Sequence, residues 1–82
     1  MTAAWWVYLL RCGDGTLYCG IALDLDARQE QHREGKGAKY TRGRGPLELV
    51  QREACGTRAE ALRREIEIKR MSRAAKLRLC GL

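Results

Sequence analysis

Hydrophobic and aromatic side chains dominate two short segments near the start of the chain, at residues 5–11 and 17–22. The first is rich in aromatic and aliphatic residues and contains neither Gly nor Pro, which is typical of a β-strand. Because side chains alternate across a strand, both of its faces are apolar. This pattern predicts a central strand that is covered on both sides. The second segment is predicted to be the returning strand of a hairpin.

The turn between these strands decides how two tyrosines, Tyr8 and Tyr18, are placed. A two-residue turn would put them on opposite faces of the sheet. A three-residue loop at 13–15, with Gly15 in the left-handed conformation, pairs Tyr8 with Gly20 and puts both tyrosines on one face. The sequence Gly-Asp-Gly-Thr favours the three-residue loop. We therefore expect the tyrosines to be diagonal neighbours, with a notch at Gly20 opposite Tyr8.

The rest of the chain shows helical signals and one more strand. Asp24 and Ser72 are suited to cap helices, and Thr57 with Glu60 forms a capping box. Strands are predicted at 5–11, 17–22 and 47–53, and helices at 24–34, 57–70 and 72–80. These elements predict an α+β fold, with a small central three-stranded antiparallel sheet flanked by helices. The length of 82 residues predicts one domain, spanning 1–82.

Composition narrows the classes of function. The longest apolar run, residues 3–10, is too short to span a bilayer and is not preceded by the basic residues of a secretion signal. We therefore expect a cytoplasmic protein without membrane association. Four cysteines lack the paired spacing of a zinc site and are predicted to be free thiols.

The net charge of +6 is concentrated in one part of the chain. Residues 1–32 have two basic side chains against four acidic ones, whereas residues 33–82 have fourteen against six. This asymmetry indicates a polyanionic partner such as nucleic acid, although a solvated arginine-rich surface would look the same.

A glycine-rich basic segment lies at residues 35–46. Its basic residues suit contacts with phosphates, and its tyrosine suits stacking on an unpaired base. The alternative is a solvated loop with no ligand. The candidate nucleic-acid-binding residues are Lys36, Lys39, Tyr40, Arg42 and Arg44.

Three polar residues occupy positions where the helices should face the sheet. Arg28 and His32 lie on the apolar side of the first helix, three and seven residues after Leu25. Glu65 lies on the buried arc of the second helix, where a carboxylate is costly unless it is paired or binds a metal. The alternatives are a surface arginine paired with a nearby acid, a histidine favoured by the helix dipole, and an ion pair between Glu65 and Lys69 or an arginine.

Taken in order, these residues resemble the GIY-YIG nuclease family over essentially the whole chain. The sequence is most similar to its small stand-alone branch, the UPF0213 or YhbQ-like group. Tyr8 matches the tyrosine of the first signature, and Tyr18 with Gly20 matches the second. Trp-Val replaces Gly-Ile in the first signature and Cys replaces Ile in the second, at positions that serve packing. Arg28, His32 and Glu65 match the further family residues.

The resemblance implies metal-dependent endonuclease activity on phosphodiester bonds in DNA, with single-stranded or structured DNA among the candidates and DNA favoured over RNA. Glu65 would be the protein ligand of one Mg²⁺ or Mn²⁺ ion. Arg28 would contact the scissile phosphate, and His32 would act as a proton relay or second phosphate contact. Tyr8 would be the general base, with its pKa lowered by Arg28 and the metal, and Tyr18 would orient water or phosphate.

A binding module of the same fold that cleaves poorly by itself is the alternative function. Many family nucleases have an additional module for DNA binding, and we expect none within residues 1–82. The sequence does not specify the oligomeric state, and a monomer is assumed. For all five chemical residues to cooperate, we expect Arg28, His32 and Glu65 to cover the same sheet face as the tyrosines.

Overall fold

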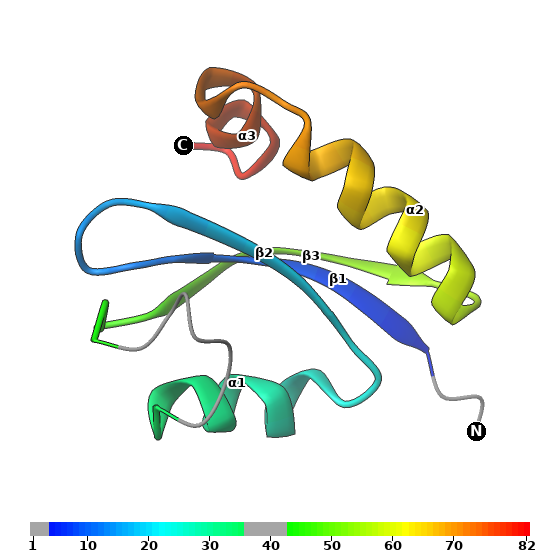
Figure 1. Cartoon of the computed structure of the whole chain (residues 1–82), viewed down its shortest axis with the longest axis horizontal. Helices are drawn as coiled ribbons and strands as arrows, with labels where there is room; N and C mark the ends of the chain where they lie inside the picture. The colour runs from blue at the N-terminus through cyan, green and yellow to red at the C-terminus, as the bar shows by residue number, and fades with distance from the viewer. Residues whose placement is uncertain (1–3, 36–42) are drawn as a thin grey trace.

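The computed structural model describes residues 4–35 and 43–82, which form a sheet with helices on both faces (Figure 1). In chain order the elements are β1 (Trp5–Arg11), β2 (Leu17–Ala22), α1 (Leu25–Arg33), β3 (Glu48–Cys55), α2 (Arg58–Lys69) and α3 (Arg73–Leu79). Helix α1 lies on one face of the sheet, and α2 and α3 lie on the other. The predicted α+β fold is confirmed, and β3 extends two residues beyond its predicted end.

The three strands are antiparallel in the order β2-β1-β3. Strand β1 is central, as its two apolar faces predict, and its residues Val7 to Leu10 are each 1% exposed. A register shift interrupts the β1–β3 pairing between Leu9 and Leu10. Because β1 lies in the middle, β2 is one edge of the sheet, and on its outer side it pairs with no other described strand.

The β1–β2 turn has the three-residue form that the sequence predicts. The Cys12 N–H donates to the Thr16 carbonyl over 2.8 Å, and Gly15 adopts a φ of 85°. Tyr8 consequently pairs with Gly20. The Asp14 carboxylate accepts hydrogen bonds from the Thr16 backbone and hydroxyl at 3.1 and 2.6 Å, which stabilises the loop.

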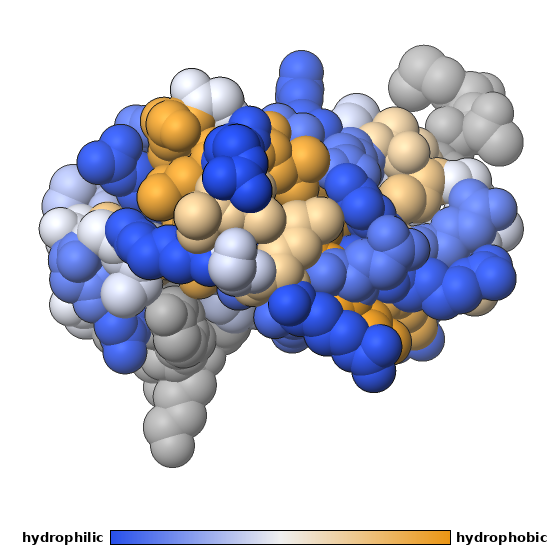
Figure 2. Space-filling model, turned by 90° about the horizontal axis from the view of Figure 1, so that it is seen from above, coloured by the Kyte–Doolittle hydropathy of each residue, from blue (hydrophilic) through white to orange (hydrophobic). Residues whose placement is uncertain are grey.

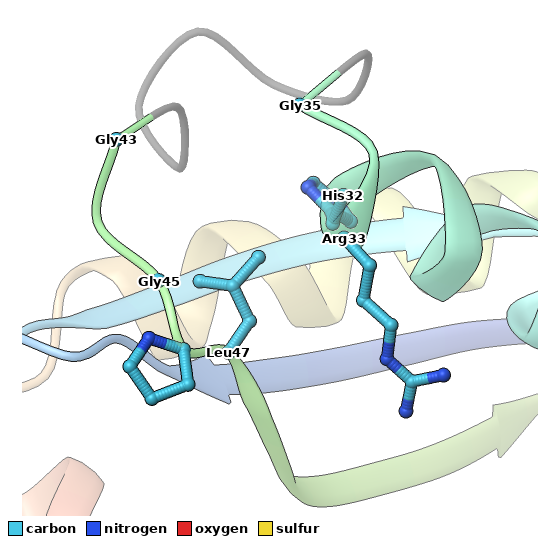
Figure 3. A pocket seen from close by; sticks show the side chains of 7 residues that line it. His32, Arg33, Gly35, Gly43, Gly45 and Leu47 are labelled. Carbon is cyan, nitrogen blue, oxygen red and sulfur yellow. The ribbon is translucent and has the colours of Figure 1, made fainter.

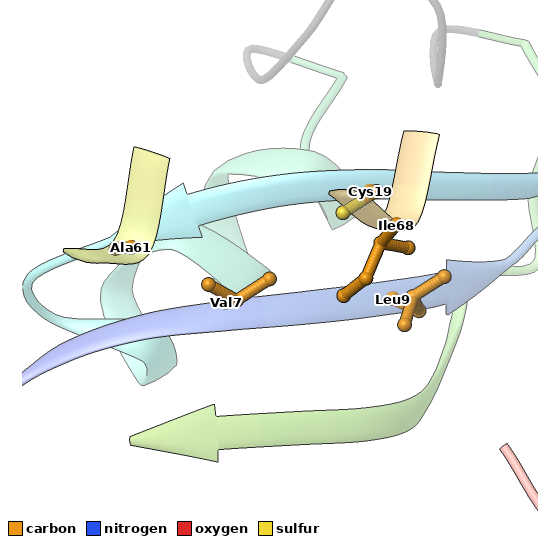
Figure 4. Close-up of a cluster of buried hydrophobic side chains, with 5 residues drawn as sticks. All are labelled: Val7, Leu9, Cys19, Ala61 and Ile68. Carbon is orange, nitrogen blue, oxygen red and sulfur yellow. The ribbon is translucent and has the colours of Figure 1, made fainter. Parts of the chain in front are cut away.

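Each face of the sheet has its own hydrophobic cluster. On the side of α2, the buried residues are Val7, Leu9, Cys19, Ala61 and Ile68 (Figure 4). On the side of α1, they are Tyr8, Leu10, Ala22 and Leu25. The alternation of β1 thus sends its tyrosine toward α1 and its neighbours toward α2.

The three helix caps form as the sequence predicts, but one large hydrophobic residue of α2 does not face the sheet. Asp24, Thr57 and Ser72 each accept a hydrogen bond from the backbone N–H three residues on, at 3.0–3.1 Å. Ile66 is 49% exposed although it is one of the large hydrophobic residues of α2. The sheet contacts instead follow the row Ala61, Glu65 and Ile68, which is spaced four and three residues apart, and Ile66 lies to the side of this row. Within the described residues, none of the helices has the length and apolar character needed to cross a bilayer.

Candidate active site

Two tyrosines lie together on the α1 side of the β1–β2 hairpin. The ring centroids of Tyr8 and Tyr18 are 6.3 Å apart, so the expectation that they share a face is confirmed. The Tyr8 ring extends over Gly20, where a Cβ atom would lie 2.7 Å from the Tyr8 hydroxyl and 3.0 Å from Tyr18 Cε2. Only a residue without a side chain fits this position while both rings remain in place.

Helix α1 brings His32 against this pair. The Tyr8 hydroxyl and His32 Nε2 are 2.8 Å apart, and the imidazole is also edge-on to Tyr18 at a centroid distance of 5.4 Å. His32 is 2% exposed and Tyr8 is 1% exposed. His32 is in the last turn of α1, as the helix-dipole alternative requires, but its burial and its contact with Tyr8 give it a more specific environment.

Arg28 lies one turn before His32 on α1 and is oriented by polar neighbours. Its guanidinium donates to Gln31 Oε1 over 2.9 Å. Hydrogen bonds with Tyr8 and, more weakly, Tyr18 raise the Arg28 pKa above its usual range. These contacts replace the alternative in which Arg28 pairs with a neighbouring carboxylate. A permanent cation is thus held beside both phenol rings.

Burial dominates the electrostatics of the Tyr8 hydroxyl. Loss of solvent raises the pKa of Tyr8 to about 12, and the nearby Tyr18 adds to this effect, although the hydrogen bond with Arg28 acts in the opposite direction. Arg28 lowers the Tyr8 pKa as the sequence predicts, but without a metal the larger effect of burial leaves this pKa raised. Burial also lowers the pKa of His32, and the Arg28 charge lowers it further. Around pH 7 the pair therefore consists of a neutral phenol and a neutral imidazole.

Glu65 lies on the opposite side of the sheet from the tyrosines. It belongs to α2, which packs on the Val7 and Leu9 face, so the expectation that all five residues cover one face is wrong. The alternation of β1 explains the error, because α1 and α2 cover different faces. The Glu65 side chain is 17% exposed and its carboxylate lies 3.4 Å from Lys69 Nζ, which is the ion pair considered as an alternative.

Strand β2 connects these two groups of residues. Glu65 lies close enough to Cys19 for its charge to contribute to the raised pKa of that thiol, which is about 11 mainly because of burial. Cys19 follows Tyr18 directly, and Tyr18 interacts with Arg28 on the other face. Since β2 is an edge strand, Tyr18 and Arg28 on one face and Glu65 on the other flank the same stretch of edge.

A divalent cation could bind at Glu65 only if water and substrate supply most of its ligands. Among residues 4–35 and 43–82, no cluster of three or more His, Cys, Asp or Glu side chains could enclose a metal ion. Glu65 does offer a half-buried carboxylate already compensated by a cation. Mg²⁺ commonly binds through one or two carboxylates plus water and phosphate oxygens, so this donor set fits it.

A hollow of about 330 Å³ reaches His32 from the end of α1 (Figure 3). Its lining includes His32, Gly43, Gly45 and Leu47. The segment before β3 is anchored by Gly13 N–H, which donates to the Arg44 carbonyl, and by the Arg44 side chain, which pairs with Asp14 over 2.5 Å. The buried imidazole thus borders a space open to solvent molecules.

The predicted nucleic-acid-binding residues are only partly described. Lys36, Lys39, Tyr40 and Arg42 lie outside the described residues. Arg44 is described, and its ion pair with Asp14 gives it a role in holding the hairpin turn. Three further basic residues were not identified from the sequence as candidate nucleic-acid-binding residues. They lie beside β2 on the α2–α3 side and are Lys69, Arg73 and Lys76. Their only sequence signal was the excess of basic residues after residue 33.

Comparison with known proteins places this geometry among related chains. The family model for the GIY-YIG catalytic domain matches residues 4–78. A UPF0213 protein of Staphylococcus aureus (strain Mu3 / ATCC 700698) is 53% identical over 73 residues, which cover 89% of each chain.

Two solved structures share the fold. The solution NMR structure of the UPF0213 protein BH0048 from Bacillus halodurans aligns with a TM-score of 0.62 at 47% identity, covering 95% of this chain and 83% of that one. The solution NMR structure of the protein EF2693 from E. faecalis aligns with a TM-score of 0.63 at 32% identity, covering 93% and 82%.

Proposed function

The chain belongs to the GIY-YIG family of catalytic domains, which is a nuclease family, and from that premise we propose that it is a metal-dependent endonuclease acting on DNA. The observation that carries this proposal is the group of Tyr8, Tyr18, Arg28 and His32 on one side of β2, with Glu65 on the other. A phosphodiester lying across this edge would meet a cation, hydroxyl groups and a carboxylate together.

Arg28 is proposed to bind the scissile phosphate. Its guanidinium is permanently charged and offers paired N–H donors that match two phosphate oxygens. As water attacks, negative charge accumulates on those oxygens, and a fixed cation stabilises the transition state more than the ground state. Bound at Glu65 and completed by water and phosphate oxygens, a Mg²⁺ or Mn²⁺ ion would supply further positive charge to the same phosphate.

Tyr8 is proposed to relay a proton rather than to exist as a free phenolate. With a pKa of about 12, the phenol is almost entirely protonated at neutral pH. We assign the His32 proton to Nδ1, so that the Tyr8 hydroxyl donates to Nε2 at 2.8 Å. The Tyr8 oxygen can then take a proton from the attacking water while its own proton passes to His32.

The proposed relay balances the hydrolysis. The water oxygen forms a bond to phosphorus as the bond between phosphorus and the leaving sugar oxygen breaks, and that oxygen takes a proton from solvent. The proton received by His32 leaves through the adjoining hollow, and the low pKa of the imidazole favours this release. Tyr18, beside Arg28 and less buried than Tyr8, is placed to orient the water or the phosphate.

A nucleic-acid-binding module with little cleavage of its own is the second candidate. Two observations favour it: the Tyr8 pKa is raised, and the Glu65 carboxylate is engaged by Lys69. Both features would have to change when a metal and substrate bind. The two candidates differ in whether phosphodiester bonds are broken.

Incubation of the purified protein with DNA and RNA separates the candidates. Single-stranded, duplex and branched DNA and RNA are each incubated with Mg²⁺, Mn²⁺ or chelator, beside the Tyr8→Phe and Glu65→Ala variants. The nuclease proposal predicts metal-dependent products that Tyr8→Phe reduces by a factor of about 10² or more, since a positioned proton-transfer group contributes about 10²–10⁴. Binding of every substrate without products would select the binding module. Undiminished cleavage by Glu65→Ala would overturn the metal assignment.

A further inference from the structure

Two adjoining hollows lie beside β2 on the α2–α3 side of the sheet. One, of about 420 Å³, is lined by Leu9, Leu17, Tyr18, Cys19, Lys69 and Lys76. The other, of about 200 Å³, is lined by Thr16, Leu17, Arg73 and Lys76. They share Leu17 and Lys76, and together we call them the α3 groove. Figure 2 views the molecule from the side of α2 and α3 and shows hydrophilic side chains over much of this face, with hydrophobic groups between them.

The charge of the α3 groove is strongly positive. Lys69, Arg73 and Lys76 line it, whereas none of its lining residues is acidic, and the carboxylates of Glu65 and Glu53 act on Cys19 from outside the lining. Within the part of the chain that the structure describes, neither Arg73 nor Lys76 forms an ion pair with a carboxylate. Two of the three basic side chains around the hollow thus have no carboxylate partner among the described residues, and this excess of positive charge favours an anionic ligand.

The groove is held in a fixed relation to the candidate site. The Arg73 guanidinium donates to the Gly15 carbonyl over 2.8 Å, which ties the start of α3 to the hairpin turn. Lys69 and Lys76 both lie near enough to Cys19 for their charges to lower its pKa against the larger effect of burial. Tyr18, which lines the groove, also meets Arg28 at the other face. The groove therefore continues from the edge of β2 where the proposed chemistry takes place.

We propose that the α3 groove binds the sugar-phosphate backbone of the nucleic acid beside the scissile phosphate. This inference rests on the proposed function and adds a binding surface formed by Lys69, Arg73 and Lys76. The polymer crosses the β2 edge, with one phosphate at Arg28 and the next phosphates in the groove. Lysine ammonium groups contact phosphates as point charges, so the groove contributes affinity without selecting a base sequence.

Lys69 links the groove to Glu65. Its ammonium is 3.4 Å from the Glu65 carboxylate, so in the metal-free protein its charge is partly engaged there. A divalent cation held by that carboxylate would take the place of the ammonium, and Lys69 would then be available to a phosphate. Lys76 lacks such a partner among the described residues and is available in either state.

Fluorescence anisotropy with a labelled 20-nucleotide DNA, as single strand and as duplex, tests the groove in excess chelator, where no metal-dependent cleavage occurs. A plot of the logarithm of the affinity against the logarithm of the salt concentration has a negative slope. Each phosphate contact adds about 0.7 to the size of this slope for a single strand and about 0.9 for a duplex. At 0.1 M salt, one lost contact therefore weakens binding by roughly five- to eight-fold. Lys76→Gln is expected to show this loss and to lower the salt slope by about one contact.

Two further variants serve as controls for Lys76→Gln. Arg78→Gln removes one positive charge from the exposed side of the same helix, outside the lining of the groove, and is expected to bind within two-fold of wild type. Lys76→Arg keeps the charge and should retain the affinity and the slope. Equal thermal melting of all variants excludes unfolding as the cause. Lys76→Gln binding like Arg78→Gln, with an unchanged slope, would overturn the proposal.

A double-mutant cycle tests the link through Lys69. In chelator, Lys69→Gln should weaken binding less than Lys76→Gln does, because Glu65 engages Lys69. In a Glu65→Gln background, Lys69 is released and its substitution should show the full five- to eight-fold loss. An equal effect of Lys69→Gln in both backgrounds would contradict this link. The two proposals can fail separately. If the wild type cleaves DNA but the groove variants bind it normally, the groove proposal alone is refuted. If the groove variants lose affinity but the wild type cleaves nothing, the nuclease proposal alone is refuted.

Discussion

Gly20→Ala is the substitution whose effect the structure specifies most closely. The new Cβ would lie 2.7 Å from the Tyr8 hydroxyl oxygen, 2.9 Å from Tyr8 Cζ and 3.0 Å from Tyr18 Cε2. Tyr8 is 1% exposed and cannot turn outward without disturbing its cluster. The substitution therefore forces both rings to move and puts the contact between Tyr8 and His32 at risk.

The size of this effect follows from three contributions. Overpacking a buried site costs about 1–3 kcal/mol. Loss of the Tyr8–His32 hydrogen bond destabilises the fold by about a further 0.5–1.5 kcal/mol. Replacing Gly by Ala within a strand acts in the opposite direction and stabilises it by about 0.5–1 kcal/mol. The free energy of unfolding should thus fall by about 2 kcal/mol. For a domain of this size, that lowers Tm by roughly 8–16 °C.

Thermal unfolding followed by circular dichroism measures the change, with Gly45→Ala as the matched control. A Cβ at Gly45 would meet no heavy atom within 4 Å, and its φ lies outside the left-handed region. Gly45→Ala should therefore unfold near the wild-type temperature. A Tm for Gly20→Ala within 2 °C of wild type, with the cleavage rate or DNA affinity unchanged, would refute the account of the tyrosine pair.

Three further outcomes are expected from the charged and titrating groups. His32 is the only histidine, and because burial lowers its folded pKa below the unfolded value of about 6.5, the unfolded chain binds more protons below that pH. The free energy of unfolding, measured by denaturant titration, should therefore decline as pH falls below about 6.5. It should decline less steeply in His32→Gln. The pKa of Tyr8, raised from 10.0 to about 12, predicts an ionisation step near pH 12 in the absorbance at 295 nm that Tyr8→Phe removes. The contribution of Tyr8 to stability is lost as pH rises from about 10 through 12. Arg64→Met removes a bidentate contact with Glu53 at 2.8 and 3.2 Å and should lower Tm by about 4–8 °C, a loss of about 1 kcal/mol, while DNA binding stays unchanged.

The hairpin was predictable from sequence because local signals agree there. The turn residues fixed a three-residue loop, and with it the pairing of Tyr8 with Gly20. Strand alternation then placed Tyr8 and Tyr18 on one face. Each step depends on residues close together in the chain, and turn chemistry decides between the alternative registers.

The placement of Glu65 was not predictable in the same way. The helical period showed that Glu65 faces the sheet, which its 17% exposure bears out, but the period does not show which face of the sheet α2 covers. That choice depends on the connections between distant elements. The structure puts α1 and α2 on opposite faces (Figure 1), and for this reason the proposed site spans the edge of β2 and does not lie over one face.

The pKa of Tyr8 and the α3 groove also required three-dimensional information. The sequence identified Arg28 as a cation that would lower the tyrosine pKa, but the larger opposing effect is burial by residues from two elements. The groove gathers Lys69 from α2 and Lys76 from α3, next to Leu17 of β2. The break between the two helices hides this proximity from any single helical pattern.

The claim that the site spans the β2 edge is tested most directly by locating a bound cation. Mn²⁺ is titrated into ¹⁵N-labelled protein with a cleavage-resistant phosphorothioate DNA, and paramagnetic broadening of each amide signal is recorded by NMR. The account predicts that broadening centres on Tyr18 and Cys19 of β2 and on the turn of α2 around Glu65, and that Glu65→Gln abolishes it. Broadening centred on Asp24 and Asp26, or a pattern that Glu65→Gln leaves unchanged, would contradict it.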